Sequence, residues 1–194
     1  GISRLAATPD GEAAMASEAS PLGDLYIDRS LVRSRDGEHW LFNAIEQASK
    51  FVFVRMGTSG EGGDAADFLA MLATRGPFRI ARVFTLDGEP FVADGGETDF
   101  GRACRALGIE HRLATSPDPW TRGRGARIGR ILQDDVTFAS RDYLEQLVGG
   151  FVQAYNFRRK LKTLGGRTPH AFLCRIWAQQ PARLRCDPHH DLVG

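Results

Sequence analysis

Three strand-like segments joined by short connections constrain the fold of this chain more than any other feature of its sequence. Residues 25–32 alternate between apolar and polar side chains, and residues 40–45 and 51–56 form two further runs that are typical of strands. A turn sequence at 35–38 separates the first two runs, and a short polar segment separates the second from the third. Strands this close in sequence predict an antiparallel meander.

Helices and strands alternate in the residues that follow. We interpret Asp64 and Asp99 as the caps that begin two helices, and Gly108 as the residue that ends the second. The run at 78–85, mainly apolar from Ile80, is typical of a buried central strand, and residues 109–114 are predicted to form a fifth short strand. The order predicts an α/β fold with a mixed five-stranded sheet, in which an antiparallel three-strand meander and two parallel strands are flanked by helices.

A long helix is predicted to begin at a Ser140 cap. Large apolar residues recur along it at helical spacing, at Tyr143, Leu147, Phe151 and Tyr155. The pair Gly149-Gly150 lowers helix stability by about 1 kcal/mol each relative to alanine. We therefore expect another element to pack closely against these two glycines.

Composition indicates one domain. A length of 194 residues suits a single domain, and an apolar fraction of 42% is sufficient for a core. Residues 1–22 are rich in Ala, Ser, Gly, Pro and Glu, so we expect a flexible leader or linker there. The core is expected to span residues 23–170, with a carboxy-terminal extension at 171–194.

The cysteines are odd in number and scattered, at Cys104, Cys174 and Cys186, which favours a cytoplasmic location over a disulfide scaffold. No apolar run approaches the roughly 18 residues of a membrane span, and no membrane partner is expected. Cys174, Cys186, His189 and His190 fit no zinc spacing, so we interpret them as core cysteine and tail histidines.

Charge is distributed unevenly along the chain. The net charge is +1, but residues 1–116 hold 12 Lys and Arg against 17 Asp and Glu, whereas residues 117–194 hold 13 against 7. A polyanion is therefore expected to bind the carboxy-terminal part.

The segment 117–132 concentrates this positive charge. Two prolines predict a turn at its start, and three aliphatic residues at helical spacing predict a helix at its end. Four arginines lie between them: Arg122, Arg124, Arg127 and Arg130. A glycine-rich, arginine-rich loop that leads into a helix suits a phosphate backbone, and a solvated basic loop is the alternative.

A second basic run follows the long helix and contains Arg158, Lys160 and Lys162. Two interpretations remain open. These side chains complement the helix dipole, or they contact a DNA backbone.

Several ordered blocks resemble DDE transposases and retroviral-type integrases. Residues 83–88, Val-Phe-Thr-Leu-Asp-Gly, resemble the "VLTDNG" strand end of that family. Residues 106–112 match the "LGIEHR" segment that follows it, and residues 117–123 resemble the "RPQTNG" loop. Residues 155–159 and 164–169 resemble the "YN-x-x-RPH" and "LGGRTP" blocks of bacterial insertion-sequence transposases.

The resemblance runs from about residue 25 to the carboxy terminus and implies an RNase H-like fold. In that fold Asp28 is expected on the central strand, with the strand at 80–85 parallel beside it. The resemblance also implies a family activity of DNA strand cleavage and transfer that uses Mg²⁺ or Mn²⁺.

Family members hold these ions with two aspartates and one glutamate, because a pair of hard divalent ions needs carboxylate oxygens. Asp28 matches the first aspartate. The second falls on Leu86, with Asp87 one residue further on, and the glutamate falls on Ala126, or on Gly125 if the helix start is shifted.

Two of the three carboxylate positions therefore lack an acid. We expect Asp28 to be vestigial and to be the metal ligand only if any metal binds; no cofactor is expected. Asp87 reaches the site only if the backbone bends, because a shift of one residue on a strand reverses the side chain. Asp134 and Asp135, roughly 12 Å further along the predicted helix, are poor substitutes. Glu46 is interpreted as a surface acid or a hydrogen-bonding group at the edge of the core.

The sequence thus predicts a transposase-type integrase core that is catalytically inactive and binds DNA without sequence preference, with a homodimer as a further expected assembly. Two alternatives remain open. One is an active metal-dependent strand-transferase or nuclease with an altered carboxylate set, drawn from Asp28, Asp87 and another acid. The other is a domesticated interaction module that dimerises through the helices of the family and binds no DNA.

Overall fold

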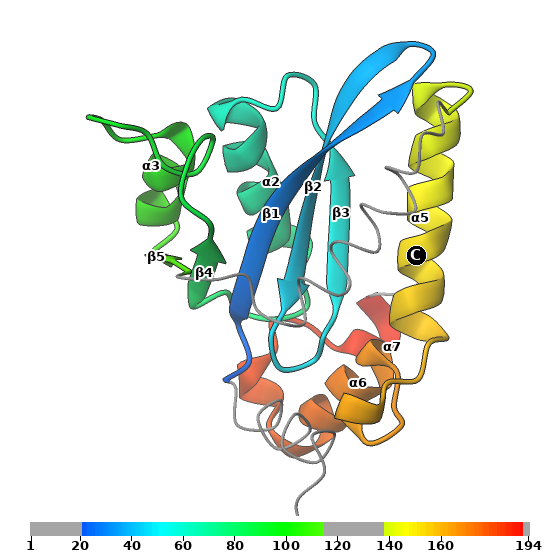
Figure 1. Ribbon diagram of the computed structural model, residues 1–194. Helices are drawn as coiled ribbons and strands as arrows, with labels where there is room; N and C mark the ends of the chain where they lie inside the picture. Colours follow the sequence, from blue (N-terminus) through cyan, green and yellow to red (C-terminus); the bar gives the residue numbers. More distant parts are fainter. Residues whose placement is uncertain (1–20, 115–137, 192–194) are drawn as a thin grey trace, which may run out of the picture.

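A mixed five-stranded sheet forms the centre of the computed structural model, which describes residues 21–114 and 138–191 (Figure 1). The strand order is β3-β2-β1-β4-β5. The strands are β1 (Asp24–Ser34), β2 (Gly37–Glu46), β3 (Val52–Met56), β4 (Arg82–Thr85) and β5 (Glu110–Leu113). The first three form the predicted antiparallel meander, and β4 and β5 continue the sheet in parallel beside β1, so the predicted fold class is confirmed.

Helices cover both faces of the sheet. They are α2 (Gly62–Arg75), α3 (Asp99–Ala106), α5 (Arg141–Phe157), α6 (Pro169–Gln179) and α7 (Pro188–Asp191), with two 3₁₀ turns, η1 (Lys162–Leu164) and η2 (Pro181–Arg183). None of the helices in these described ranges is long and apolar enough to cross a membrane.

The alternation of β1 divides the core into two hydrophobic clusters. Leu25 and Ile27 point to one face, where they join the buried residues of α2 and α3. Tyr26, between them, points to the other face and joins Leu144 and Val148 of α5. Successive side chains of a strand point to opposite faces, so the whole strand is sandwiched between two apolar layers.

The predicted caps of α2 and α3 were wrong: the cap of α2 lies three residues before Asp64, and the cap of α3 lies one residue before Asp99. Asp64 does not cap α2, which begins after Glu61; its carboxylate instead accepts hydrogen bonds from the backbone nitrogens of Thr58, Ser59 and Gly60. Partial burial acts to raise the pKa of Asp64, but these bonds outweigh it and lower the pKa to about 2. In α3 the cap is Thr98, whose hydroxyl accepts from the backbone of Gly101, and Asp99 lies in the first turn.

Ser140 caps α5 as predicted, accepting a hydrogen bond from the backbone nitrogen of Tyr143 at 3.1 Å. The expected close packing at Gly149-Gly150 was wrong, because a β-carbon added at either residue would meet no atom within 4 Å. An open cavity of about 500 Å³ lies beside Gly149, between α5 and β3.

Asn156 fastens the end of α5 to the sheet. Its side-chain oxygen accepts a hydrogen bond from the backbone nitrogen of Val52 at 2.9 Å, and its side-chain nitrogen donates to the carbonyl of the same residue at 2.8 Å. The buried amide is therefore satisfied by backbone groups of β3, as a buried polar group requires.

Glu46 is completely buried and is a hydrogen-bonding group of the core, the second of the two roles considered for it. Its carboxylate accepts from the backbone nitrogens of Gly23, Ala48 and Ser49 and from the Ser49 hydroxyl, at 2.5–3.2 Å. Burial raises the pKa of Glu46, although the hydrogen bonds act in the opposite direction. One carboxylate thereby ties the start of β1 to the turn between β2 and β3.

The carboxy-terminal segment packs into the same core. The boundary expected after residue 170 falls inside α6, and Leu173 and Leu184 are buried in the cluster on the α2 face. An antiparallel bridge between Phe78 and Leu184 joins this segment to the chain that leads into β4.

Candidate functional site

Asp28 lies at the centre of the sheet because β1 is paired along both of its edges. In the antiparallel ladder it stands opposite Asn43 of β2. In the parallel ladder Tyr26 stands beside Phe84 of β4. The parallel ladder ends at this pair; continued at the same offset, Leu86, which follows β4, would come level with Asp28. Leu86 also packs against the α5-face cluster that contains Tyr26, so the two side chains lie on the same face of the sheet.

The surroundings of Asp28 are poorly suited to a charge. Burial raises the pKa of Asp28, and this effect outweighs both the hydrogen bond from the Arg29 backbone nitrogen, at 2.7 Å, and the nearby positive charge of Arg29. No ion pair to Asp28 is formed within residues 21–114 and 138–191. The carboxylate is thus held beside hydrocarbon with little electrostatic compensation.

Asp87 is exposed at the end of β4, and its carboxylate accepts a hydrogen bond from the backbone nitrogen of Gly88 at 3.0 Å. A contribution of Asp87 to the Asp28 site stays a prediction. The position of the third family carboxylate, Ala126 or Gly125, lies outside the described residues, as do Asp134 and Asp135.

The side chains around Asp28 do not fit a two-metal centre. Leu86 offers no donor atom where the resemblance places the second carboxylate, and Mg²⁺ and Mn²⁺ bind through oxygen. Within the described part of the chain, no three His, Cys, Asp or Glu side chains converge in a way that could hold a metal ion. Cys174 and His170 are close, with the Cys174 sulfur 3.7 Å from Nε2 of His170, but no third such side chain joins them in the described residues. The expectation that the chain binds no cofactor stays a prediction.

Comparison of structures finds similar proteins where comparison with family models and curated proteins finds none. No protein-family model and no curated protein matches the chain. The catalytic core domain of BIV integrase superposes with a TM-score of 0.59 at 16% identity, over 82% of this chain and 98% of that domain. The HTLV-2 integrase catalytic core domain, solved in complex with magnesium in a dimeric form, gives 0.57 at 16% identity, over 78% and 94%.

A third match is an intasome of simian T-cell lymphotropic virus in complex with the PP2A regulatory subunit B56 gamma. Its TM-score is 0.53 at 17% identity, over 73% of this chain and 50% of that one. The chain has the RNase H-like fold of an integrase catalytic core. At identities this low the likeness establishes the integrase-core fold, and function has to be argued from side chains.

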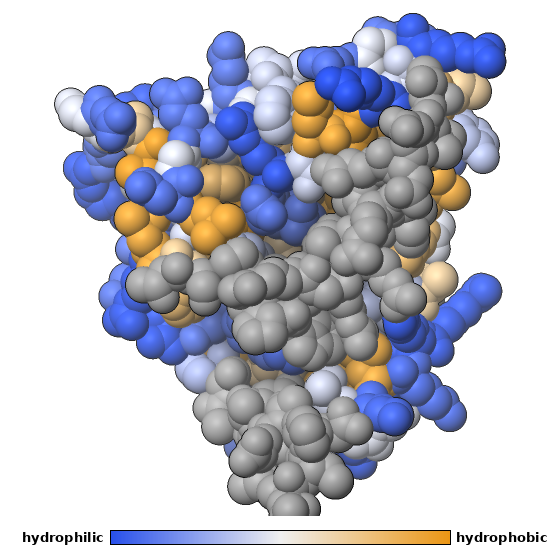
Figure 2. All heavy atoms as spheres, viewed as in Figure 1, coloured by the Kyte–Doolittle hydropathy of each residue, from blue (hydrophilic) through white to orange (hydrophobic). Residues whose placement is uncertain are grey.

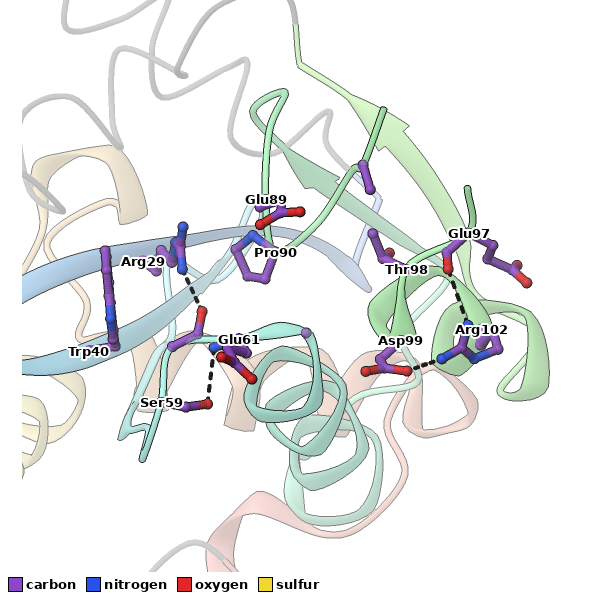
Figure 3. A pocket seen from close by; sticks show the side chains of 13 residues that line it. Arg29, Trp40, Ser59, Glu61, Glu89, Pro90, Glu97, Thr98, Asp99 and Arg102 are labelled. Carbon is purple, nitrogen blue, oxygen red and sulfur yellow. Dashed lines mark hydrogen bonds and ion pairs between the residues drawn. The ribbon is translucent and has the colours of Figure 1, made fainter. Parts of the chain in front are cut away.

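The opposite face of β1 borders a cavity of about 460 Å³ (Figure 3). Arg29 points into it, lies 4.1 Å from the centroid of the Trp40 ring and donates a hydrogen bond to the carbonyl of Gly60. On the far wall, Arg102 pairs with Asp99. Four acids and these two arginines line the cavity, the acids being Glu61, Glu89, Glu97 and Asp99. An excess of carboxylates disfavours a phosphate ligand, so this cavity is not the polyanion site expected from the sequence.

Of the basic residues predicted to contact DNA, the structure places three. Arg158, Lys160 and Lys162 are exposed, immediately after α5. The four arginines of the 117–132 segment lie outside the described residues, and their role stays a prediction. The contact between Arg29 and Trp40 was not predicted from the sequence. Strand alternation does place Arg29 on the face opposite to Asp28.

We expect Asp28→Asn to raise the free energy of unfolding at neutral pH. The pKa of Asp28 is raised above its ordinary value of 3.8 in the folded state. An acid of this kind destabilises the folded state above that raised pKa, and the penalty disappears as the pH falls to 3.8 and both states become protonated. The neutral amide has no such penalty at any pH. Urea unfolding at several pH values measures the difference, which should be largest near neutrality and shrink toward pH 3.8. An Asn variant less stable than the wild type at pH 7 would contradict this assignment.

Proposed function

We propose that this chain is a transposase-type integrase-core domain that binds nucleic acid and does not carry out strand transfer. The observation that supports the proposal is that Leu86, at the position where the resemblance expects the second carboxylate, packs its isobutyl group against the apolar cluster that contains Tyr26, on the face of the sheet to which Asp28 points. The HTLV-2 integrase core of the same fold was solved with magnesium. In this chain Asp28 would have to bind a divalent ion without a second carboxylate. Binding would then be weak, because Mg²⁺ gives up its water ligands reluctantly.

The metal test uses calorimetry with Mn²⁺. We expect no saturable binding to the wild type, and no change in any measured activity in Asp28→Asn. Leu86→Asp should create weak Mn²⁺ binding, because it restores a second carboxylate beside the first, whereas the isosteric Leu86→Asn should not. Metal-dependent DNA cleavage by the wild type that is lost in Asp28→Asn would overturn the proposal and favour the altered carboxylate set.

Nucleic-acid binding is attributed to the arginine segment, Arg122, Arg124, Arg127 and Arg130, together with Arg158, Lys160 and Lys162. Neither group of residues belongs to a helix of the kind that enters a DNA groove and reads bases. We therefore expect contacts to the DNA phosphate backbone, which carry no sequence information. Backbone contacts of this kind release counterions and weaken steeply with salt.

Reversal of charge at Arg124 and Arg127 tests this attribution. The double variant Arg124→Glu with Arg127→Glu should weaken binding to unrelated duplexes by similar factors, on the order of tenfold, in a gel shift at low salt. The matched control is Arg35→Glu with Arg55→Glu, two exposed arginines, the first in the turn between β1 and β2 and the second on β3, and it should bind as the wild type does. Binding that survives unchanged in the test variant would remove the segment from the interface.

Self-association is a second candidate role, favoured by apolar residues on α5. Tyr143 and Leu147 are 52% and 38% exposed on this helix. The HTLV-2 core of this fold was solved as a dimer. We expect sedimentation to show a dimer that Leu147→Glu dissociates, whereas Gln146→Glu, the same charge on the neighbouring exposed residue, leaves it intact. A wild-type chain that stays monomeric at high concentration would exclude this role.

A further inference from the structure

One stretch of the chain contains no acid over 41 residues. Residues 146–186 hold eight of the 25 Lys and Arg and none of the 24 Asp and Glu. The other 17 basic residues share the rest of the chain with all 24 acids. The positive charge of the carboxy-terminal part is therefore concentrated in a segment that includes the end of α5, η1, α6 and η2.

Six basic residues outside this stretch form ion pairs inside the molecule. Ion pairs join Arg33 to Glu38, Arg82 to Asp24, Arg102 to Asp99, Arg105 to Glu97, Arg112 to Glu110 and Arg141 to Glu145. Four exposed residues of the acid-free stretch differ from these: Arg158, Lys160, Lys162 and Arg167. Among the described residues, no carboxylate pairs with any of the four, so their charge is directed at the surroundings.

These four residues share one short turn, residues 158–167, which we call the basic turn. The turn is closed by a hydrogen bond from the backbone nitrogen of Leu161 to the carbonyl of Arg167, at 2.9 Å. Leu161 and Leu164 are buried and anchor it to the α5-face cluster. Gly165 and Gly166 have φ angles of 62° and 76°, which favour glycine, and the Gly166 nitrogen donates back to the Leu161 carbonyl at 2.9 Å.

The start of the basic turn is fixed as well, because Asn156 holds the last turn of α5 to Val52. Charged side chains on a backbone that is already ordered lose less conformational freedom on binding than those of a flexible loop. The turn therefore presents its four cationic groups on a preformed surface.

The basic turn lies at one end of the sheet. In Figure 1 the chain after α5 runs below the sheet, at the end where β1 and β3 begin. Figure 2, in the same view, shows strongly hydrophilic side chains projecting at the lower right, where α5 ends. Asp28 lies further along β1, as the fifth of its 11 residues.

We infer that the basic turn is a preformed docking surface for the phosphate backbone of duplex DNA, separate from the Asp28 site. This inference rests on the proposed nucleic-acid binding and assigns it to a surface. Arginine guanidinium and lysine ammonium groups that have no acidic partner bind phosphate groups well. The turn has no helix that could enter a groove and read bases, so its contacts are to the phosphate backbone. The large hydrophobic residues exposed in the described structure are Leu107, Leu113, Tyr143 and Leu147. None lies on the turn, which therefore lacks the apolar groups that a membrane-binding surface inserts.

The experiment compares two double charge reversals in the full chain. The test variant is Lys160→Glu with Lys162→Glu, and the control is Arg35→Glu with Arg55→Glu; both change the net charge equally, and all four residues are exposed. Binding to a short duplex of arbitrary sequence is followed by fluorescence anisotropy between about 50 and 200 mM salt. We expect the test variant to bind on the order of tenfold more weakly, with a salt slope lower in magnitude by about two. The control should bind as the wild type does.

The outcomes separate this inference from the proposed function. A test variant that keeps wild-type affinity and salt slope, or that weakens only as much as the control, overturns the basic turn as the docking surface while duplex binding itself stands. A wild-type chain that binds no duplex removes the proposed function. Circular dichroism of both variants shows whether the fold is kept, and Lys160→Gln with Lys162→Gln provides a milder second test. Tighter binding to vesicles of anionic lipid than to the duplex would also overturn the assignment.

Discussion

The pairing of β1 along both of its edges is the constraint on which the rest of the structure depends. A strand that is antiparallel to one neighbour and parallel to the other has no freedom to shift, because a slip of one residue would send Leu25 and Ile27 out of one apolar layer and Tyr26 out of the other. On the β2 side, the register of the antiparallel ladder sets Asn43 opposite Asp28.

Two acids inside this sheet illustrate different solutions to burial. Glu46 is completely buried, but its carboxylate accepts four hydrogen bonds. These bonds join the start of β1 to the turn between β2 and β3. Asp28 is less deeply buried but receives a single backbone hydrogen bond from its own neighbour. A buried charge without compensation costs stability, and such groups occur mainly at functional sites. The contrast marks Asp28 as the less compensated of these two acids.

Much of the fold could be predicted from the sequence because the strands carry a clear alternation. The period of two in residues 25–32 predicted a strand, and the family resemblance placed this strand at the centre of the sheet. The hydrogen-bond partners of individual polar side chains were harder to predict. Asp64 has the residue type of a cap, but its carboxylate is used by the loop before the helix, which only the path of that loop reveals. The burial of Leu173 and Leu184 was hard to predict for a related reason, since residues far away in sequence bury them. The candidate site was predicted in part: Leu86 followed from a motif, whereas the cavity around Arg29 depends on three separate segments.

Asn156 has a consequence for the outer edge of the sheet. β3 is the last strand on its side, and an edge strand offers unpaired backbone groups to which a strand of another chain can be added. At Val52 both of these groups are occupied by one side-chain amide, which makes the two hydrogen bonds that an added strand would make there. The start of this edge is therefore closed to strand addition and to the aggregation that follows from it. Contacts with other molecules at this end of the domain are left to side chains.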